Sequence, residues 1–425
     1  MSSFRKASLV ATVAVTACAG QSDRGPIIVT FPGSSLGSEA QVLNRQLGRF
    51  NAQHPSIRVV RRDTPDAADQ RHQLYVQWLN AGASDPDILQ LDAIWTPEFA
   101  AAGWILPLDR FGPDTAGFFA STIRANQWQD TLFALPWFVD VGMLYWRTDL
   151  VPSAPQTLSQ LVEQAKRARQ KHGLRYGLVW QGARYEGLIT NFVEYLGAYG
   201  GQILDQGRVV VNSEAGLQAL TEMRNEIYRD GIVPSAVLTW HEEESRFAFQ
   251  NGDAVFMRNW PYAVGLMRDS SQSRVAGRFS VAAMPAGPGG RPTAALGGAQ
   301  LAINRRTENP EAAWAVINYL TQPGQMRERA RVVGQFPSRV ALYEGSGLSA
   351  ELGLDPATVR RVIEYAVPRP VTPVYNQISE ILQIHLHRAL TRQTTPAAAL
   401  ERAQTEMERL LDRVGLGSGA PTVQR

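Results

Sequence analysis

Cysteine is nearly absent from the sequence, because Cys18 is the only one among 425 residues. A lone cysteine cannot form an internal disulfide, so a disulfide-stapled fold is excluded. No run of about 18 or more apolar residues occurs either, which is the length that a membrane-spanning helix needs. We therefore expect a mature chain that folds around an ordinary hydrophobic core and meets a membrane only at an anchor.

Strong charge of one sign and the motifs of common catalytic sites are also missing. The formal net charge is only +3 and no lysine/arginine block occurs, which argues against nucleic acid as a partner. The sequence contains no HExxH, P-loop or GxSxG motif, and its six histidines are scattered. The acidic run at 242–244 is typical of a solvated helix start. The sequence thus predicts no metal ion, cofactor or catalytic centre.

The length of the chain predicts two domains, because 425 residues exceed what one α/β core usually holds. Short apolar runs alternate with helical patterns, which indicates an α/β protein with crossover connections on parallel sheets. The proline- and glycine-rich segment 285–292 marks a turn where the chain passes between lobes. The clearest expected strands lie at 26–31, 57–60, 88–91, 254–257 and 296–303.

The first residues have the layout of a secretory signal. Arg5 and Lys6 precede an uncharged, mostly apolar run at 7–17. The small residues before Cys18 look like the lipobox of bacterial lipoproteins, although Cys18 could also be an ordinary small residue of a signal peptide. An acylated Cys18 would hold the exported protein on the extracytoplasmic face of the cell membrane. The expected segments are a signal peptide (1–17), a lipid-anchored linker (18–26) and a disordered tail (415–425).

Acidic and aromatic residues follow two of the expected strands, at the end of an open sheet where ligands bind. Asp92 directly follows the strand at 88–91, and Trp260 and Tyr262 follow the strand at 254–257. Each also has a purely structural explanation, which the pattern leaves open. Asp92 could cap the next helix, and Trp260 could fill the core.

Two further carboxylates are candidates. Glu39 lies in the first turn of an expected helix, where it could equally interact with the helix dipole. Asp140 stands in an apolar stretch, and burying a carboxylate there without partners or water is costly. Carboxylates accept hydrogen bonds from sugar hydroxyls, and indole or phenol rings pack on the C–H faces of pyranoses. Together these residues favour a sugar-binding cleft.

Six stretches recur in the order and spacing of a known family. Through them the chain, from about Ile27 to Leu411, resembles family 1 extracellular solute-binding proteins of ATP-binding-cassette (ABC) importers. Within that family it is most similar to the trehalose/maltose-binding proteins. The stretches are 84–92 (SDPDILQLD), 103–109 (GWILPLD), 180–188 (WQGARYEGL), 258–262 (RNWPY), 296–298 (LGG) and 367–370 (VPRP).

The resemblance implies a two-lobe periplasmic-binding-protein fold of the Venus-flytrap type, with hinge-connected lobes and an interlobe cleft. Lobe 1 would comprise 27–137 and 292–343, and lobe 2 would comprise 138–291 and 344–414.

The resemblance also assigns the site. The positions that would hydrogen-bond the sugar are Glu39, Arg71, Asp92, Asp140 and Arg369. The positions that would pack on it or offer backbone contacts are Trp260, Tyr262 and Gly298.

Two residues depart from the trehalose/maltose-binding pattern. Ala299 replaces a tryptophan and removes a stacking face, and Phe138 replaces a tyrosine and removes a hydroxyl. The resemblance therefore predicts a sugar more firmly than it predicts trehalose.

The function expected from the sequence is that of a monomeric, non-catalytic sugar-binding lipoprotein. It would capture a small oligosaccharide such as trehalose or maltose by lobe closure and deliver it to the permease subunits of an ABC importer. One alternative is a sugar-sensing receptor that feeds a signalling partner. A less favoured alternative is a glycoside hydrolase with Asp92 and Asp140 as acid and base.

Overall fold

The structure is a computed structural model that describes residues 25–33, 37–65, 68–344 and 348–417. The expected signal peptide and Cys18 lie outside these ranges, as do parts of the expected linker and tail. Within the described ranges, no helix is both long enough and apolar enough to span a membrane.

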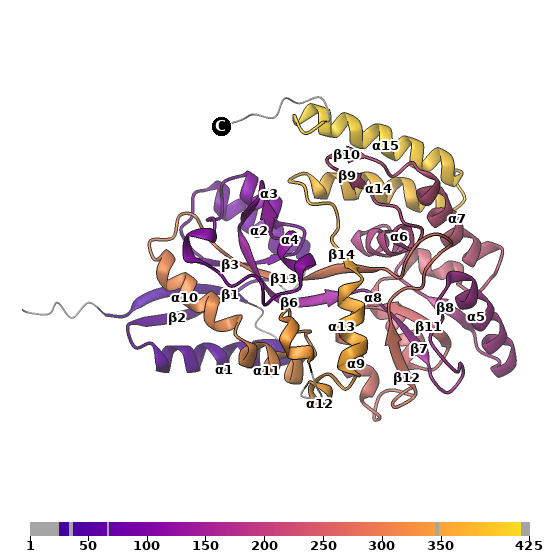
Figure 1. The fold of residues 1–425 in the computed structure, drawn as a ribbon, viewed down its shortest axis with the longest axis horizontal. Coiled ribbons are helices and arrows are strands. Elements are labelled where there is room, and N and C mark those ends of the chain that lie inside the picture. Colours follow the sequence, from indigo (N-terminus) through magenta and orange to yellow (C-terminus); the bar gives the residue numbers. More distant parts are fainter. Residues whose placement is uncertain (1–24, 34–36, 66–67, 345–347, 418–425) are drawn as a thin grey trace, which may run out of the picture.

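Two α/β lobes form the molecule, and Figure 1 shows the long strands β6 and β13 running between the lobes. The strands are β1 (Ile27–Gly33), β2 (Ile57–Asp63), β3 (Ile88–Asp92), β4 (Gln127–Trp128), β5 (Thr131–Leu132), β6 (Ala134–Val141), β7 (Met143–Arg147), β8 (Tyr176–Val179), β9 (Leu204–Asp205), β10 (Arg208–Val209), β11 (Ala254–Asn259), β12 (Phe279–Ala282), β13 (Ala294–Ile303) and β14 (Ala366–Val367). The helices are α1 (Gly37–Gln53), α2 (Ala68–Asn80), α3 (Thr96–Ala101), α4 (Ala120–Arg124), α5 (Leu158–His172), α6 (Glu186–Ala198), α7 (Glu214–Tyr228), α8 (Glu242–Gln250), α9 (Tyr262–Arg268), α10 (Pro310–Leu320), α11 (Pro323–Val333), α12 (Ser349–Leu352), α13 (Pro356–Glu364), α14 (Tyr375–Leu390) and α15 (Pro396–Arg413).

The sheets are mixed, which corrects the expectation of purely parallel crossover units. β1 pairs with β2 in parallel, and so does β8 with β11 in the other lobe. β13, however, runs antiparallel to both β3 and β6. The chain order gives the reason: β6 leads from the first lobe toward the second, whereas β13 brings the chain back into the first lobe.

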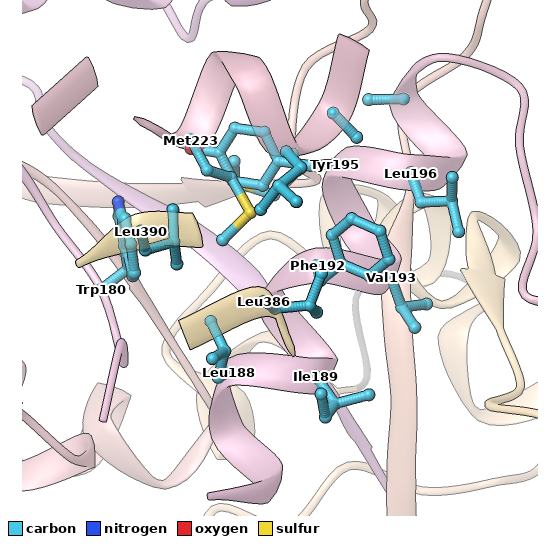
Figure 2. Close-up of a cluster of buried hydrophobic side chains, with 14 of the residues drawn as sticks. Trp180, Leu188, Ile189, Phe192, Val193, Tyr195, Leu196, Met223, Leu386 and Leu390 are labelled. Carbon is cyan, nitrogen blue, oxygen red and sulfur yellow. The ribbon is translucent and has the colours of Figure 1, made fainter. Parts of the chain in front are cut away.

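The core of the second lobe is built around α6 (Figure 2). Almost all of this helix is buried, and Phe192 packs among side chains that include Met223 of α7 and Leu386 of α14. Its sequence is mostly apolar, as expected of a helix in a protein interior. Two acidic residues of α6 are therefore held in fixed places, Glu186 at its first position and Glu194 in its middle.

A buried ion pair holds the point where the chain crosses between the lobes. Arg258 of β11 and Glu194 of α6 are both 0% exposed, and their Nη2 and Oε1 atoms are 2.5 Å apart. The guanidinium also donates to Gln181 at 3.1 Å, and Glu194 accepts from the backbone N–H of Ala295 in β13 at 3.2 Å. The pair thus links two strands (β11 and β13), α6 and the loop after β8, and both buried charges are paired and hydrogen-bonded as such charges must be.

Gly142 lies between β6 and β7 directly against this pair. Its N–H donates to the carbonyl of Ala295 at 3.1 Å, which ties the outgoing strand to the returning one. A Cβ atom at Gly142 would overlap the Glu194 carboxylate and the Arg258 guanidinium. The crossing therefore requires glycine here because only its bare Cα leaves room for the pair.

We predict that Gly142→Ala lowers the free energy of unfolding by about 3 kcal/mol or more, because it forces apart a buried ion pair. Gly48→Ala is the control: Gly48 is exposed in α1, nothing lies within 4 Å of its added Cβ, and alanine favours a helix. Urea unfolding of the two variants measures both effects. Equal stability of Gly142→Ala and wild type would show that the pair does not hold the crossing.

Candidate functional site

β13 places two of the expected carboxylates on one face of the first-lobe sheet. Asp92 of β3 lies opposite Ala299, and Asp140 of β6 lies opposite Gly297. Positions 297 and 299 are two apart on one strand, so they face the same side, and residues directly opposite them face that side too. The two aspartates flank β13 and point into the same region.

The glycines of β13 open this face. A Cβ at Gly297 would lie 3.4 Å from Cζ3 of Trp260 and 3.5 Å from Cβ of Asp140, so the indole and the carboxylate are neighbours. Gly298 has φ of +108°, and a side chain there would overlap the carbonyl of Phe138. The Gly298 carbonyl accepts from the N–H of Ala93 at 3.2 Å. Both glycines let the strand run close beneath the site.

The two residues that depart from the family pattern lie in the same row across the sheet. Phe138 of β6 is opposite Ala299, and Ala299 is opposite Asp92. Both side chains are nearly buried. The missing indole would therefore have stood next to Asp92, and the missing phenol one strand further across the sheet.

Glu39 lies at the start of α1 and reaches toward β6 from the side. Its Oε1 accepts from Arg329 Nη2 at 3.0 Å and from Gln335 Nε2 at 3.2 Å. The negative charge of Glu39 is close enough to act on Asp140. Glu39, Asp92 and Asp140 therefore form one acidic cluster, contributed by a helix and two strands.

Arg369 connects this cluster to the second lobe. Its Nη2 donates to Asp92 Oδ1 at 3.2 Å, and its Nη1 donates to Glu186 Oε1 at 2.7 Å. The hydroxyl of Tyr375 donates to the same Glu186 oxygen at 2.5 Å. Burial by itself would lower the pKa of the guanidinium, but the two carboxylates and Tyr375 outweigh it and raise the pKa above the usual value. The arginine stays charged and bridges two carboxylates, Asp92 of the first lobe and Glu186 of the second.

Trp260 lies at the end of β11, where its position was expected. Its indole ring lies over the Arg258 guanidinium, with the carbon 4.2 Å from the ring centroid, and its Nε1 donates to Glu242 at 3.4 Å. The hydroxyl of Tyr145 donates to its carbonyl at 2.6 Å. The guanidinium of the buried ion pair thus packs on one face of the indole, and the edge of the indole lies next to Gly297.

Two further expected site residues, Tyr262 and Arg71, have polar partners other than Glu39, Asp92 and Asp140 in the structure. The Tyr262 hydroxyl donates to Glu243 at 2.6 Å, and 36% of the residue is exposed. Arg71 of α2 lies over the ring of Trp95 at 5.6 Å and donates to the carbonyl of Pro65 at 3.1 Å. The helix start expected at 242–244 is present, but its carboxylates also hold Trp260 and Tyr262 rather than only facing solvent.

Burial dominates the electrostatics of Asp140. Burial, together with the nearby charges of Glu39 and Asp92, raises the pKa of this carboxyl to about 7. Arginine pairs with Glu39 and with Asp92, whereas no arginine among the described residues pairs with Asp140. The cluster therefore combines two arginine-paired carboxylates with a third that titrates near neutral pH.

A polar contact outside the cluster also joins the lobes. Glu98 of α3 accepts from His72 of α2 at 2.8 Å and from Asn376 of α14 at 3.1 Å. α14 packs on α6, α7 and α15, so Asn376 belongs to the second lobe. The two lobes touch here through protein side chains.

Sequence reasoning did not assign Glu186, Glu242 or Arg329 to the site. Glu186 follows β8 by a short loop and begins a helix, which is the same signal that singled out Asp92 and Glu39. Arg329 gives no such signal, because it lies inside α11 and reaches Glu39 only through the fold. Among the described residues, no group of three His, Cys, Asp or Glu side chains could hold a metal ion.

Comparison with known proteins agrees with this geometry. The family profile described as "Bacterial extracellular solute-binding protein" matches residues 34–327. The chain belongs to this family. A probable ABC transporter-binding protein of Deinococcus radiodurans is 34% identical over 363 residues, which cover 82% of this chain and 86% of that protein.

Solved structures of binding proteins share the fold of this family member. MalE3 of T. maritima with bound maltose is 40% identical, with a TM-score of 0.80, and the match covers 91% of this chain and 100% of that one. The sugar-binding protein MalE of Xanthomonas citri is 22% identical with a TM-score of 0.78, over 91% of this chain and 98% of its own. These likenesses establish the two-lobe fold, and the family consists of extracellular binding proteins of ABC transporters.

The raised pKa of Asp140 gives a prediction about stability and pH. The folded protein holds the Asp140 proton more tightly than the unfolded chain does, so ionisation costs stability as pH rises from about 4 to about 7. We expect Asp140→Asn to remove this loss, so that its melting temperature exceeds that of wild type by a margin that grows across this range.

The control for this experiment has the opposite sign. A hydrogen bond from Arg147 lowers the pKa of Asp149, so its carboxylate stabilises the fold at neutral pH and loses this effect in acid. Asp149→Asn should therefore melt below wild type at pH 7, with a difference that shrinks in acid. A flat pH profile for the Asp140→Asn difference would contradict the assignment of the raised pKa.

Proposed function

We propose that this protein captures a small oligosaccharide of the maltose or trehalose type between its lobes and delivers it to the permease subunits of an ABC importer. One observation supports this most: the acidic face beside β13 meets the indole of Trp260 across Gly297. The relative with bound maltose, at 40% identity, points to the same class of ligand.

The chemistry of the proposed site suits a sugar. Glu39, Asp92 and Glu186 accept hydrogen bonds from hydroxyls, and Arg369 donates to ring or glycosidic oxygens. Trp260 and Tyr262 offer aromatic faces for the C–H side of a pyranose. A few convergent polar groups among aromatic rings is the usual composition of a small-molecule site.

Binding and closure are linked in this proposal. Groups from both lobes, such as Asp92 of lobe 1 and Trp260 of lobe 2, would contact one ligand only when the lobes approach each other. A ligand that binds the closed state more tightly shifts the population toward it. The hinge would lie where β6 and β13 cross, and the proposed lobes keep the boundaries 27–137 with 292–343 and 138–291 with 344–414.

The proposal can be tested by calorimetry with maltose, trehalose and glucose, together with an assay for released glucose. We expect a disaccharide to bind with 1:1 stoichiometry and to remain intact. Release of glucose would instead support the glycoside hydrolase. Binding of none of the three sugars, and of no longer glucan, would overturn the assignment of a sugar as ligand.

Trp260→Ala should weaken disaccharide binding about tenfold or more, because the sugar loses a stacking face that is fixed by Arg258. Trp314→Ala is the matched control: Trp314 is partly buried and stacks on Phe111, away from the cluster. Calorimetry gives the affinities and thermal melts give the stabilities of both variants. A Trp260→Ala variant that melts far below wild type would identify the indole as a core residue instead.

We also propose export and lipid anchoring through Cys18, on the strength of the signal-like first 17 residues. Cys18→Ser expressed in a bacterial host should move the protein from the membrane fraction to the soluble extracytoplasmic fraction, because a single acyl-bearing residue supplies the anchor. Fractionation and immunoblotting measure this. A variant that remains membrane-bound would refute lipidation at Cys18.

A further inference from the structure

Arg329 of α11 occupies an unusual position beneath the acidic cluster. It is 1% exposed, and its guanidinium carbon lies 3.9 Å from the ring centroid of Trp137 and 5.5 Å from that of Phe138. Burial lowers the pKa of this arginine to about 10, although Glu39 acts in the opposite direction. A cation in such a place requires a specific partner, because isolated buried charge is costly.

Glu39 is that partner, and the described residues donate to only one of its oxygens. Arg329 Nη2 and Gln335 Nε2 both donate to Oε1, while Gln335 Oε1 in turn accepts from Arg329 Nε at 2.8 Å. No described residue donates to Glu39 Oε2, and the side chain is 34% exposed. Arg329 and Gln335 thus form a bracket that holds the carboxylate by one oxygen and leaves the other for a hydroxyl from outside.

The bracket also restricts motion. A glutamate side chain free in solvent samples many rotamers and loses that freedom when it binds a ligand. Two donors on one oxygen, together with an arginine locked against Trp137, place the carboxylate before the ligand arrives. Preorganisation of this kind raises affinity because less entropy is lost on binding.

Resting on the proposed function, we propose that Arg329 is a positioning residue for sugar binding: it fixes Glu39 so that Oε2 accepts a hydroxyl of the ligand. Arg329 itself is too buried to touch the sugar. The side chains that set the orientation of Glu39 are then Arg329 and Gln335, which lie almost 300 residues away in sequence.

A double-mutant cycle in maltose binding tests this role. Arg329→Met keeps the length and apolar packing of the side chain and removes the charge and the donors. We expect it to weaken maltose binding about tenfold in the wild-type background. In the Glu39→Gln background the same substitution should change the affinity by less than about twofold, because the residue acts only through Glu39. Arg329→Lys should recover part of the affinity.

Arg327→Met is the matched control, because Arg327 lies two residues away on α11, is 44% exposed and pairs with Glu351. It should bind maltose as wild type does. Thermal melts of every variant separate loss of the fold from loss of positioning, and Gln335→Met gives a second way to weaken the bracket if Arg329→Met does not fold.

The outcomes distinguish this inference from the proposed function. If wild type binds no sugar, both fail. If wild type binds maltose but Arg329→Met binds equally well, only the inference fails. If Arg329→Met weakens binding by the same factor with and without Glu39, the arginine acts through the fold rather than through Glu39, and the inference is likewise overturned.

Discussion

The ion pair between Arg258 and Glu194 is the interaction on which the rest of this structure depends. It lies with no solvent exposure at the crossing of the two lobes, where it contacts β13 and leaves room only for glycine at position 142. The same guanidinium supports the indole of Trp260. A buried pair is weak evidence for stability, but here it fixes the geometry of the hinge and of the aromatic face together.

The three carboxylates of the acidic cluster differ in their charged partners. Arg329 and Arg369 each pair with one carboxylate, Glu39 or Asp92, and Asp140 has no such partner among the described residues. Burial, together with the nearby charges of Glu39 and Asp92, raises the pKa of Asp140. One cluster therefore holds carboxylates of different character, two that pair with arginine and one whose pKa is raised.

Much of the fold and part of the site could be predicted from local sequence. Asp92 and Trp260 were found because each ends an apolar strand, and Asp140 because a carboxylate interrupts an apolar stretch. The roles of Arg71 and Arg369 came from the family pattern alone. The role of Arg329 and the antiparallel course of β13 were not predicted. Both arise from contacts between segments distant in sequence, and periodicity and capping signals report only on local structure.

The contact of His72, Glu98 and Asn376 has a consequence for transport. Every favourable bond between protein groups of the two lobes stabilises their closed arrangement and so strengthens capture of a ligand that binds that arrangement. The same bond must be broken before the cargo can leave. In such a protein, tighter binding of the ligand comes with slower release to the transporter. The few polar atoms at this edge of the interface therefore affect both the affinity and the rate of release.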